Sequence, residues 1–164
     1  MAKTATTTKI KTTVRSASQS ARKLVITRVF DAPRETVFRA WTEPARLVRW
    51  WGPKDFTIPE YKMDVRPGGA WRTVMRSPRG ERHSVQGVFR EIVAPERLVF
   101  TWAWEDEHGK PGHETIVAVE FRARGDKTEL TLTHSVFESA KSRDAHKSGW
   151  SSSLDCLAEH LAKA

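Results

Sequence analysis

The sequence predicts an α+β fold in which a curved antiparallel sheet of about seven strands wraps around one long C-terminal helix. Three observations support this prediction. The C-terminal stretch is the only long one with helical period, turn sequences recur through the middle of the chain, and an apolar β-branched segment near the N-terminus precedes two short helical segments. The expected architecture is one helix held by one sheet.

The first predicted strand covers residues 23–30, which are apolar and β-branched. It stops at Asp31 and Pro33, where Asp31 can cap a helix and Pro33 can occupy its first turn. Two short helices are expected next, and Gly52 and Pro53 end the second one. Their apolar positions are Val37, Phe38, Trp41, Leu47, Val48, Trp50 and Trp51.

Between residues 56 and 137 the chain is divided by turn sequences at intervals that suit β-hairpins. These turns are residues 66–69, 77–80, 94–97, 108–112 and 124–127, and they delimit six strands. Alternation gives three of the strands an apolar face. The faces are Leu98, Phe100, Trp102 and Trp104; then Val117, Val119 and Phe121; then Leu130, Leu132, His134 and Val136.

The last predicted helix covers residues 142–162. Its apolar residues recur at steps of four, three and four, which gathers them in one stripe of a helix about 30 Å long. This stripe is Trp150, Leu154, Leu157 and Leu161. Asp144 suits the positive end of the helix dipole. One face of the sheet must be covered, and the stripe is the available cover.

The chain of 164 residues is long enough for one domain without disulfides or a structural metal. Its lone Cys156 permits no intrachain disulfide, and together with the absence of a secretory segment it fits a reducing, cytoplasmic compartment. No run of about 18 apolar residues predicts a membrane span.

The basic charge is concentrated at the N-terminus. Of the formal net charge of +8, six charges lie within residues 1–23, and without them the net charge is +2. They belong to Lys3, Lys9, Lys11, Arg15, Arg22 and Lys23. Residues 1–22 are therefore predicted to be a disordered basic tail, preferred over an organelle transit peptide, and residues 23–164 to be the folded domain. No specific nucleic-acid binding is expected.

Five segments follow one another in an order that resembles a known family. They are Val29-Phe-Asp-Ala-Pro33 with Val37-Phe-Arg-Ala-Trp41, Leu47-Val-Arg-Trp-Trp-Gly-Pro53, Asp64-Val-Arg-Pro-Gly-Gly69, residues 87–102, and Gly149-Trp-Ser-Ser-Ser-Leu-Asp-Cys-Leu157. Over about residues 24–162 the chain resembles the helix-grip fold of the START-like (SRPBCC) superfamily. Within it, the chain is similar to bacterial proteins related to the C-terminal domain of the activator of Hsp90 ATPase. Relatives in the superfamily bind lipids, hormones or polyketides.

A sheet curled around one helix leaves a concave, mostly apolar cleft wherever the facing side chains do not fill it. A single inward tryptophan is most often a core residue, but seven in one chain favour an aromatic cavity. The residues predicted to line it are Trp71, Thr73, Met75, Val85, Trp102, Trp104, His134, Trp150 and Leu154. The first hypothesis is therefore the binding of a small hydrophobic or aromatic molecule, with no cofactor.

Two other hypotheses stay open. The cavity could serve a cyclase- or hydrolase-like enzyme, with His134 or His83 as a weak candidate for the acid–base group. A lone histidine on an apolar face is more often a satisfied core residue, so binding is favoured over catalysis. Hsp90-type chaperone or other weak protein interaction is implied by the resemblance alone, and no room is expected for the Hsp90-activating N-terminal domain. The spacing of the six histidines predicts no metal site.

The predicted tail leads to a first test. Proteolytic removal of residues 1–20 should leave the melting temperature of the domain unchanged, because a disordered segment contributes no packed contacts. Thermal unfolding measured before and after limited proteolysis checks this. A loss of cooperative melting on removal of the tail would contradict it.

Overall fold

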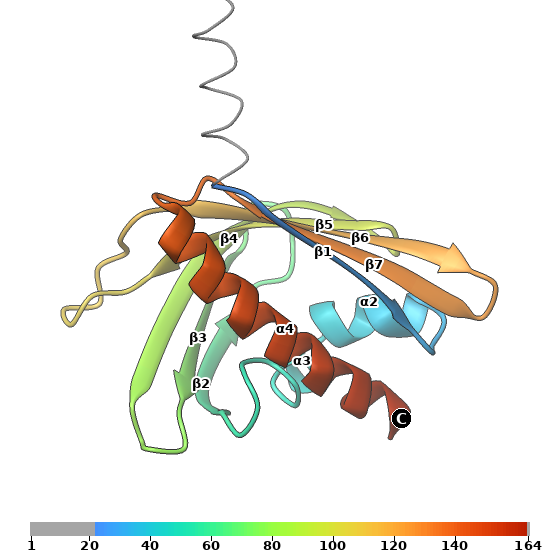
Figure 1. Ribbon diagram of the computed structural model, residues 1–164, viewed down its shortest axis with the longest axis horizontal. Helices are drawn as coiled ribbons and strands as arrows, with labels where there is room; N and C mark the ends of the chain where they lie inside the picture. The colour runs from blue at the N-terminus through green and yellow to red at the C-terminus, as the bar shows by residue number, and fades with distance from the viewer. Residues whose placement is uncertain (1–21, 164) are drawn as a thin grey trace, which may run out of the picture.

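The strands form one antiparallel sheet that curves over a long helix, as the predicted fold class requires (Figure 1). The computed structural model describes residues 22–163, so the predicted tail lies outside the described residues except for Arg22. The strand order is β1-β7-β6-β5-β4-β3-β2. The elements are β1 (Leu24–Phe30), α2 (Arg34–Thr42), α3 (Pro44–Leu47), β2 (Thr57–Met63), β3 (Ala70–Arg76), β4 (Arg82–Val93), β5 (Arg97–Trp104), β6 (Thr115–Arg124), β7 (Lys127–Ser135) and α4 (Ala140–Ala162).

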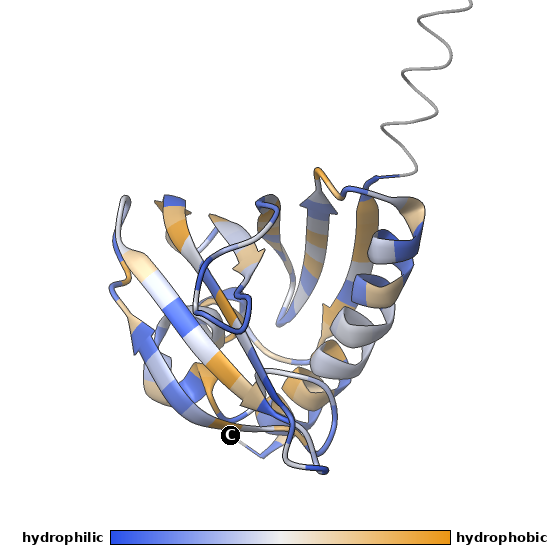
Figure 2. Cartoon of the chain, turned by 90° about the vertical axis from the view of Figure 1, so that its left-hand side faces the viewer, coloured by the Kyte–Doolittle hydropathy of each residue, from blue (hydrophilic) through white to orange (hydrophobic). Residues whose placement is uncertain are grey.

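The sheet has one apolar face and one polar face, and hydrophobic and hydrophilic residues alternate along its strands (Figure 2). The apolar face carries the predicted inward residues of β5, β6 and β7, which are buried except for Trp104 at the end of β5, which is 36 % exposed. One prediction was wrong: Val136 is 50 % exposed, because β7 ends at Ser135 and Val136 adopts a φ of 68° that turns the chain. Phe137 enters the core in its place.

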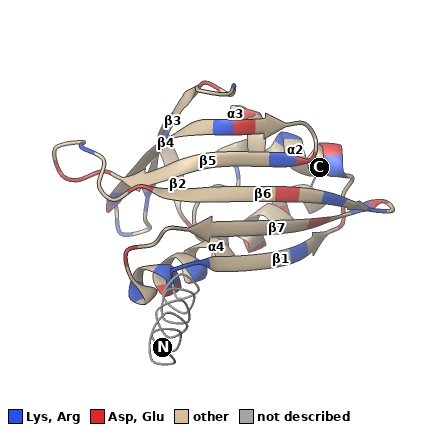
Figure 3. Ribbon diagram, turned by 90° about the horizontal axis from the view of Figure 1, so that it is seen from above, with Lys and Arg blue, Asp and Glu red and all other residues tan. Residues whose placement is uncertain are grey.

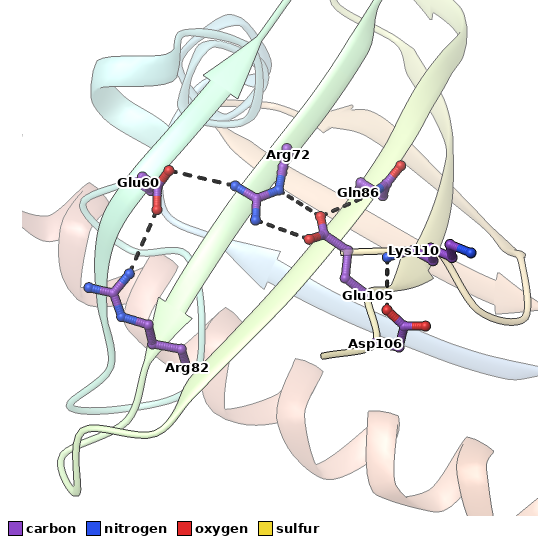
Figure 4. A network of polar contacts seen from close by, with 7 residues as sticks. All are labelled: Glu60, Arg72, Arg82, Gln86, Glu105, Asp106 and Lys110. Carbon is purple, nitrogen blue, oxygen red and sulfur yellow. Dashed lines mark hydrogen bonds and ion pairs between the residues drawn. The ribbon is translucent and has the colours of Figure 1, made fainter. Parts of the chain in front are cut away.

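The opposite face carries charged residues of both signs (Figure 3). Arg97 of β5 bonds Glu120 of β6 at 2.6 Å, which links neighbouring strands. Towards the other edge, the Arg72 guanidinium makes two hydrogen bonds, of 2.6 and 3.0 Å, to the Glu105 carboxylate, and Gln86 donates a third (Figure 4). These bonds lower the pKa of Glu105. Because Glu105 directly follows Trp104, the network holds the end of β5 that carries this tryptophan.

Helix α4 begins earlier than predicted. Its N-cap is Ser139, whose hydroxyl accepts a hydrogen bond from the Ser142 backbone N–H at 3.1 Å, so the helix begins at Ala140, two residues before the predicted start at residue 142. The predicted apolar stripe is confirmed, because all four of its residues are buried. Arg28 of β1 also pairs with Asp155 and donates to the Ser151 carbonyl, which ties the outer side of α4 to the edge strand.

The two short helices differ from the prediction in detail. The N-cap of α2 is Pro33, with no side-chain hydrogen bond, so Asp31 does not cap this helix. Helix α3 ends at Leu47, and Trp50 and Trp51 follow it in a tight turn whose N–H groups bond the Leu47 carbonyl. The turn brings both indoles under the sheet rather than along a helix face.

All seven tryptophans of the chain belong to one contact network. Trp51 and Trp102 are its centres: their ring centroids lie 5.9 Å apart, and each also contacts Trp71 and Trp150. Most contacts are edge-to-face or tilted, the geometries that aromatic quadrupoles favour. The network joins the short helices, the sheet and α4 into one core. No helix within residues 22–163 is long and apolar enough to cross a membrane.

The packing of α4 against the sheet can be tested by substituting two neighbouring residues of the helix. Leu154→Ala should lower the free energy of unfolding by about 2 to 5 kcal/mol, because it leaves a cavity where Leu154 is fully buried. Asp155→Ala should cost less than about 1 kcal/mol, because its ion pair with Arg28 is exposed. Chemical denaturation of both variants measures this, and equal losses would show that the stripe is misassigned.

Candidate functional site

A pocket of about 360 Å³ lies between α4, the inner face of β3–β5 and the loop that follows α3. Its walls are aromatic and apolar, with a few polar groups and no charged Lys, Arg, Asp or Glu side chain among the described residues. The lining residues are Trp51, Gly52, Pro53, Phe56, Met75, His83, Trp102, Trp104, Ala145, His146, Gly149, Trp150 and Ser153.

The tryptophan walls are each fixed by the element that carries them. Trp102 and Trp104 project from the same face of β5, because residues two apart on a strand point the same way. The Trp51 indole donates a hydrogen bond of 3.0 Å to the Thr73 hydroxyl, which locks the loop residue onto β3. Gly52 follows with a φ of 91°, a conformation that glycine adopts without strain, and this turns the loop across the pocket.

Gly149 leaves the pocket open on the side of α4. It lies inside the helix and lines the pocket, and a Cβ atom added to it would meet no atom within 4 Å. Glycine in a helix interior costs about 1 kcal/mol relative to alanine. The chain therefore gives up helix stability at the position where a larger side chain would enter the pocket.

The structure brings about half of the predicted cavity residues together around the pocket. Met75, Trp102, Trp104 and Trp150 line it, and so does the catalytic candidate His83 at its rim, with a side chain 45 % exposed. The other predicted residues are buried in the packing around it and do not line it. They are Trp71, Thr73, Val85, His134 and Leu154.

His134 is held in a buried chain of hydrogen bonds. The Trp150 indole N–H lies 3.0 Å from His134 Nδ1, and since an indole nitrogen can only donate, Nδ1 is the acceptor. His134 Nε2 therefore carries the proton and donates to the Thr115 hydroxyl at 2.7 Å, which in turn donates to the Trp102 carbonyl at 3.1 Å. Burial, and secondarily the nearby His146, lowers the pKa of His134 to about 2. The imidazole is thus neutral, with both nitrogens occupied.

His146 of α4 forms a second indole–imidazole pair, which sequence reasoning missed. Its Nε2 accepts from the Trp104 indole at 2.8 Å, so its Nδ1 carries the proton and donates to the Ser142 carbonyl at 2.7 Å. Burial lowers the pKa of His146, and the bond to Ser142 opposes this effect only in part. The signal was present, because His146 lies one helical turn before Trp150 on the apolar stripe.

The remaining wall residues come from parts of the chain that sequence patterns do not place. Pro53 and Phe56 belong to an irregular loop, whose path depends on tertiary contacts. Ala145, Gly149 and Ser153 lie on α4 beside the stripe, where small side chains carry no hydrophobic signal. No group of three or more potential metal-binding side chains occurs within residues 22–163.

A larger cleft of about 730 Å³ adjoins the pocket along the loop and shares Trp51, Gly52, Pro53 and Phe56 with it. Its other walls carry six charged side chains of both signs, namely Glu43, Arg46, Arg49, Asp55, Glu159 and Lys163. Charged groups of this kind are well solvated, and they offer little apolar surface to a ligand. We therefore assign the candidate site to the smaller, aromatic pocket.

The chain matches a known protein family over most of its length. The family model described as "Activator of Hsp90 ATPase homolog 1-like protein" matches residues 31–162. No curated protein matches the chain.

Solved structures of bacterial proteins share the fold. The AHSA1 protein from Silicibacter pomeroyi is 31 % identical, with a TM-score of 0.80 over 85 % of this chain and 97 % of that chain. A protein from Arthrobacter aurescens is 26 % identical, with a TM-score of 0.78 over 88 % of each chain. A protein from Chromobacterium violaceum is 28 % identical, with a TM-score of 0.75 over 84 % of this chain and 95 % of that chain.

The lowered pKa of His134 predicts a pH-dependent stability. As the pH falls below about 6.5, the unfolded chain takes up a proton at this histidine and the folded chain does not, so the free energy of unfolding should fall by about 1.4 kcal/mol per pH unit. His146 should add to the fall, because its pKa is lowered too.

Urea denaturation between pH 5 and 7 measures this slope. His134→Gln should make the slope shallower, because it removes one of the titrating groups. His108→Gln is the matched control, since the His108 side chain is 74 % exposed, and it should keep the wild-type slope. Equal slopes in the wild type and in His134→Gln would contradict the assignment of a neutral, buried imidazole.

Proposed function

Because the chain belongs to the family of activator of Hsp90 ATPase homolog 1-like proteins, we propose that it binds a small hydrophobic or aromatic molecule in the pocket between α4 and the sheet. The family's fold supports a ligand-binding domain. The observation that carries the proposal for this chain is an aromatic pocket kept open by Gly149, in a core that otherwise packs all seven tryptophans together.

The size and chemistry of the pocket favour a compact apolar ligand. Its volume of about 360 Å³ falls at the lower end of small-molecule sites, which span about 300 to 1,000 Å³. Flat indole walls from Trp102, Trp104 and Trp150 suit the faces and edges of an aromatic ring. Each Å² of apolar surface removed from water contributes about 25 cal/mol, so such a ligand gains affinity mainly by burial.

Binding is a better account of the site than catalysis. A general acid–base group needs a nitrogen within reach of the substrate and a pKa near the working pH. His134 does not line the pocket, and both nitrogens of His134 and His146 are engaged in hydrogen bonds. His83 is the one titratable wall residue in the described chain whose ring has no hydrogen bond, and it lies at the solvent-exposed rim.

The test is to fill the pocket from the helix side. Titration with N-phenyl-1-naphthylamine, a neutral apolar dye, should quench tryptophan fluorescence of the wild type in a saturable manner. Gly149→Leu should weaken this binding by about tenfold or more, because the new side chain occupies open space in the pocket. It should not destabilise the fold, since leucine is a better helix former than glycine.

Gly149→Ala is the matched control. It adds a single methyl group with no atom within 4 Å, so it should keep most of the binding and raise the free energy of unfolding by about 1 kcal/mol. Wild-type affinity in Gly149→Leu would place dye binding elsewhere and overturn the proposed site.

A further inference from the structure

We infer that Ser153 selects the ligand of this pocket, and that the ligand carries an oxygen, in a hydroxyl or a carbonyl group, that pairs with the Ser153 hydroxyl. This inference rests on the proposed function and adds the chemical class of the ligand. Three observations support it: the pairing of the buried polar side chains, the position of Ser153 on α4, and the surface that its hydroxyl retains.

Ser153 differs from the other buried residues that carry a hydroxyl or an imidazole. Within residues 22–163 its side chain makes no hydrogen bond, whereas the side chains of the other five are all hydrogen-bonded inside the protein. Those five are Thr73, Thr101, Thr115, Thr128 and His134. Buried polar groups of folded proteins are normally paired, so the exception requires an explanation.

The position of Ser153 on α4 turns its side chain toward the pocket. It follows His146 by seven residues and Gly149 by four, a spacing that places all three on one face of the helix. All three line the pocket, and Ser153 does not line the adjoining charged cleft. Side chains of a helix lean toward its N-terminus, so Ser153 points along α4 to the space that Gly149 leaves open.

The Ser153 hydroxyl also keeps contact with the space around it. In the described part of the chain, the side-chain atoms that are both sealed from solvent and unpaired are nitrogens of Arg34, Trp41 and Trp102. The Ser153 oxygen is unpaired but is not one of these atoms, so it retains surface that solvent can reach. Because Ser153 is only 5 % exposed and lines the pocket, a bound ligand can reach this oxygen and cover it.

This free hydroxyl makes the pocket selective. Water in the pocket can bond to the hydroxyl, but a hydrocarbon that displaces the water offers no partner and leaves the hydroxyl buried and unpaired. A ligand hydroxyl or carbonyl restores the bond, since a serine hydroxyl both donates and accepts. His83 imposes no such requirement, because its half-exposed ring at the rim stays in contact with solvent. The expected ligand is therefore a compact aromatic molecule such as a phenol or an aryl ketone.

Two naphthalenes of nearly equal size test the inference. 2-Naphthol carries a hydroxyl, and 2-methylnaphthalene carries a methyl group in its place. Displacement of N-phenyl-1-naphthylamine gives a dissociation constant for each compound, and the ratio of the two constants measures the preference of the pocket for the hydroxyl. Comparing this ratio between the wild type and a variant cancels the difference in hydration between the two compounds.

Ser153→Ala should shift this ratio by about 3- to 10-fold against 2-naphthol, because the compound's hydroxyl loses its partner while the methyl group loses nothing. Ser151→Ala is the matched control. Ser151 lies on the same helix but outside the pocket, where its carbonyl accepts a hydrogen bond from Arg28, so this variant should keep the wild-type ratio.

Thermal unfolding of Ser153→Ala tests the premise separately. The melting temperature should be unchanged or higher, because no internal hydrogen bond is lost and alanine is a better helix former than serine. A lower melting temperature would overturn the inference, since the hydroxyl would then be paired inside the protein.

The binding outcomes separate this inference from the proposed function. If both compounds displace the dye with the same ratio in the wild type and in Ser153→Ala, the inference is overturned and the proposed function stands. If neither compound displaces the dye, the pocket does not take an aromatic molecule of this size, and the proposed function fails together with the inference.

Discussion

The hydrogen bond from the Trp150 indole to His134 is the interaction on which the rest of this structure depends. An apolar stripe holds a helix against a sheet, but by itself it fixes neither the rotation nor the position of the helix along its axis, because the hydrophobic effect has no direction. The bond supplies that direction, and through Thr115 it extends to the backbone of β5. Trp104 and His146 repeat the arrangement about one helical turn away, with donor and acceptor exchanged between sheet and helix.

The pocket is the part of the core that this arrangement leaves unfilled. Protein interiors pack densely, so a space bordered by Trp51, Trp102 and Trp150 would close if a side chain of α4 could enter it. At Gly149 the helix has no such side chain. The turn at Gly52 carries the loop across the pocket without filling it. The paired indoles keep the walls apart, because moving them inward would break their hydrogen bonds to buried partners.

The sequence was sufficient to predict those parts of the fold in which apolar residues repeat at a regular spacing. The seven strands, the buried stripe of α4 and the inward set of β5 follow from alternation and helical spacing, which depend only on neighbours in the chain. The walls of the pocket were harder to predict, because they combine β3, β5, α4 and an irregular loop. His134 shows the limit most clearly: its position on the inner face was predictable, but its partners are 19 and 16 residues away, and only the fold reveals that both of its nitrogens are occupied.

The same hydrogen bonds explain why binding suits this site better than catalysis. Indole donors occupy the acceptor nitrogens of His134 and His146, and burial lowers the pKa of both histidines. The Trp150–His134 and Trp104–His146 pairs are thus committed to positioning α4. With their nitrogens engaged in this way, the two histidines support the proposal that the pocket binds a molecule and does not convert it.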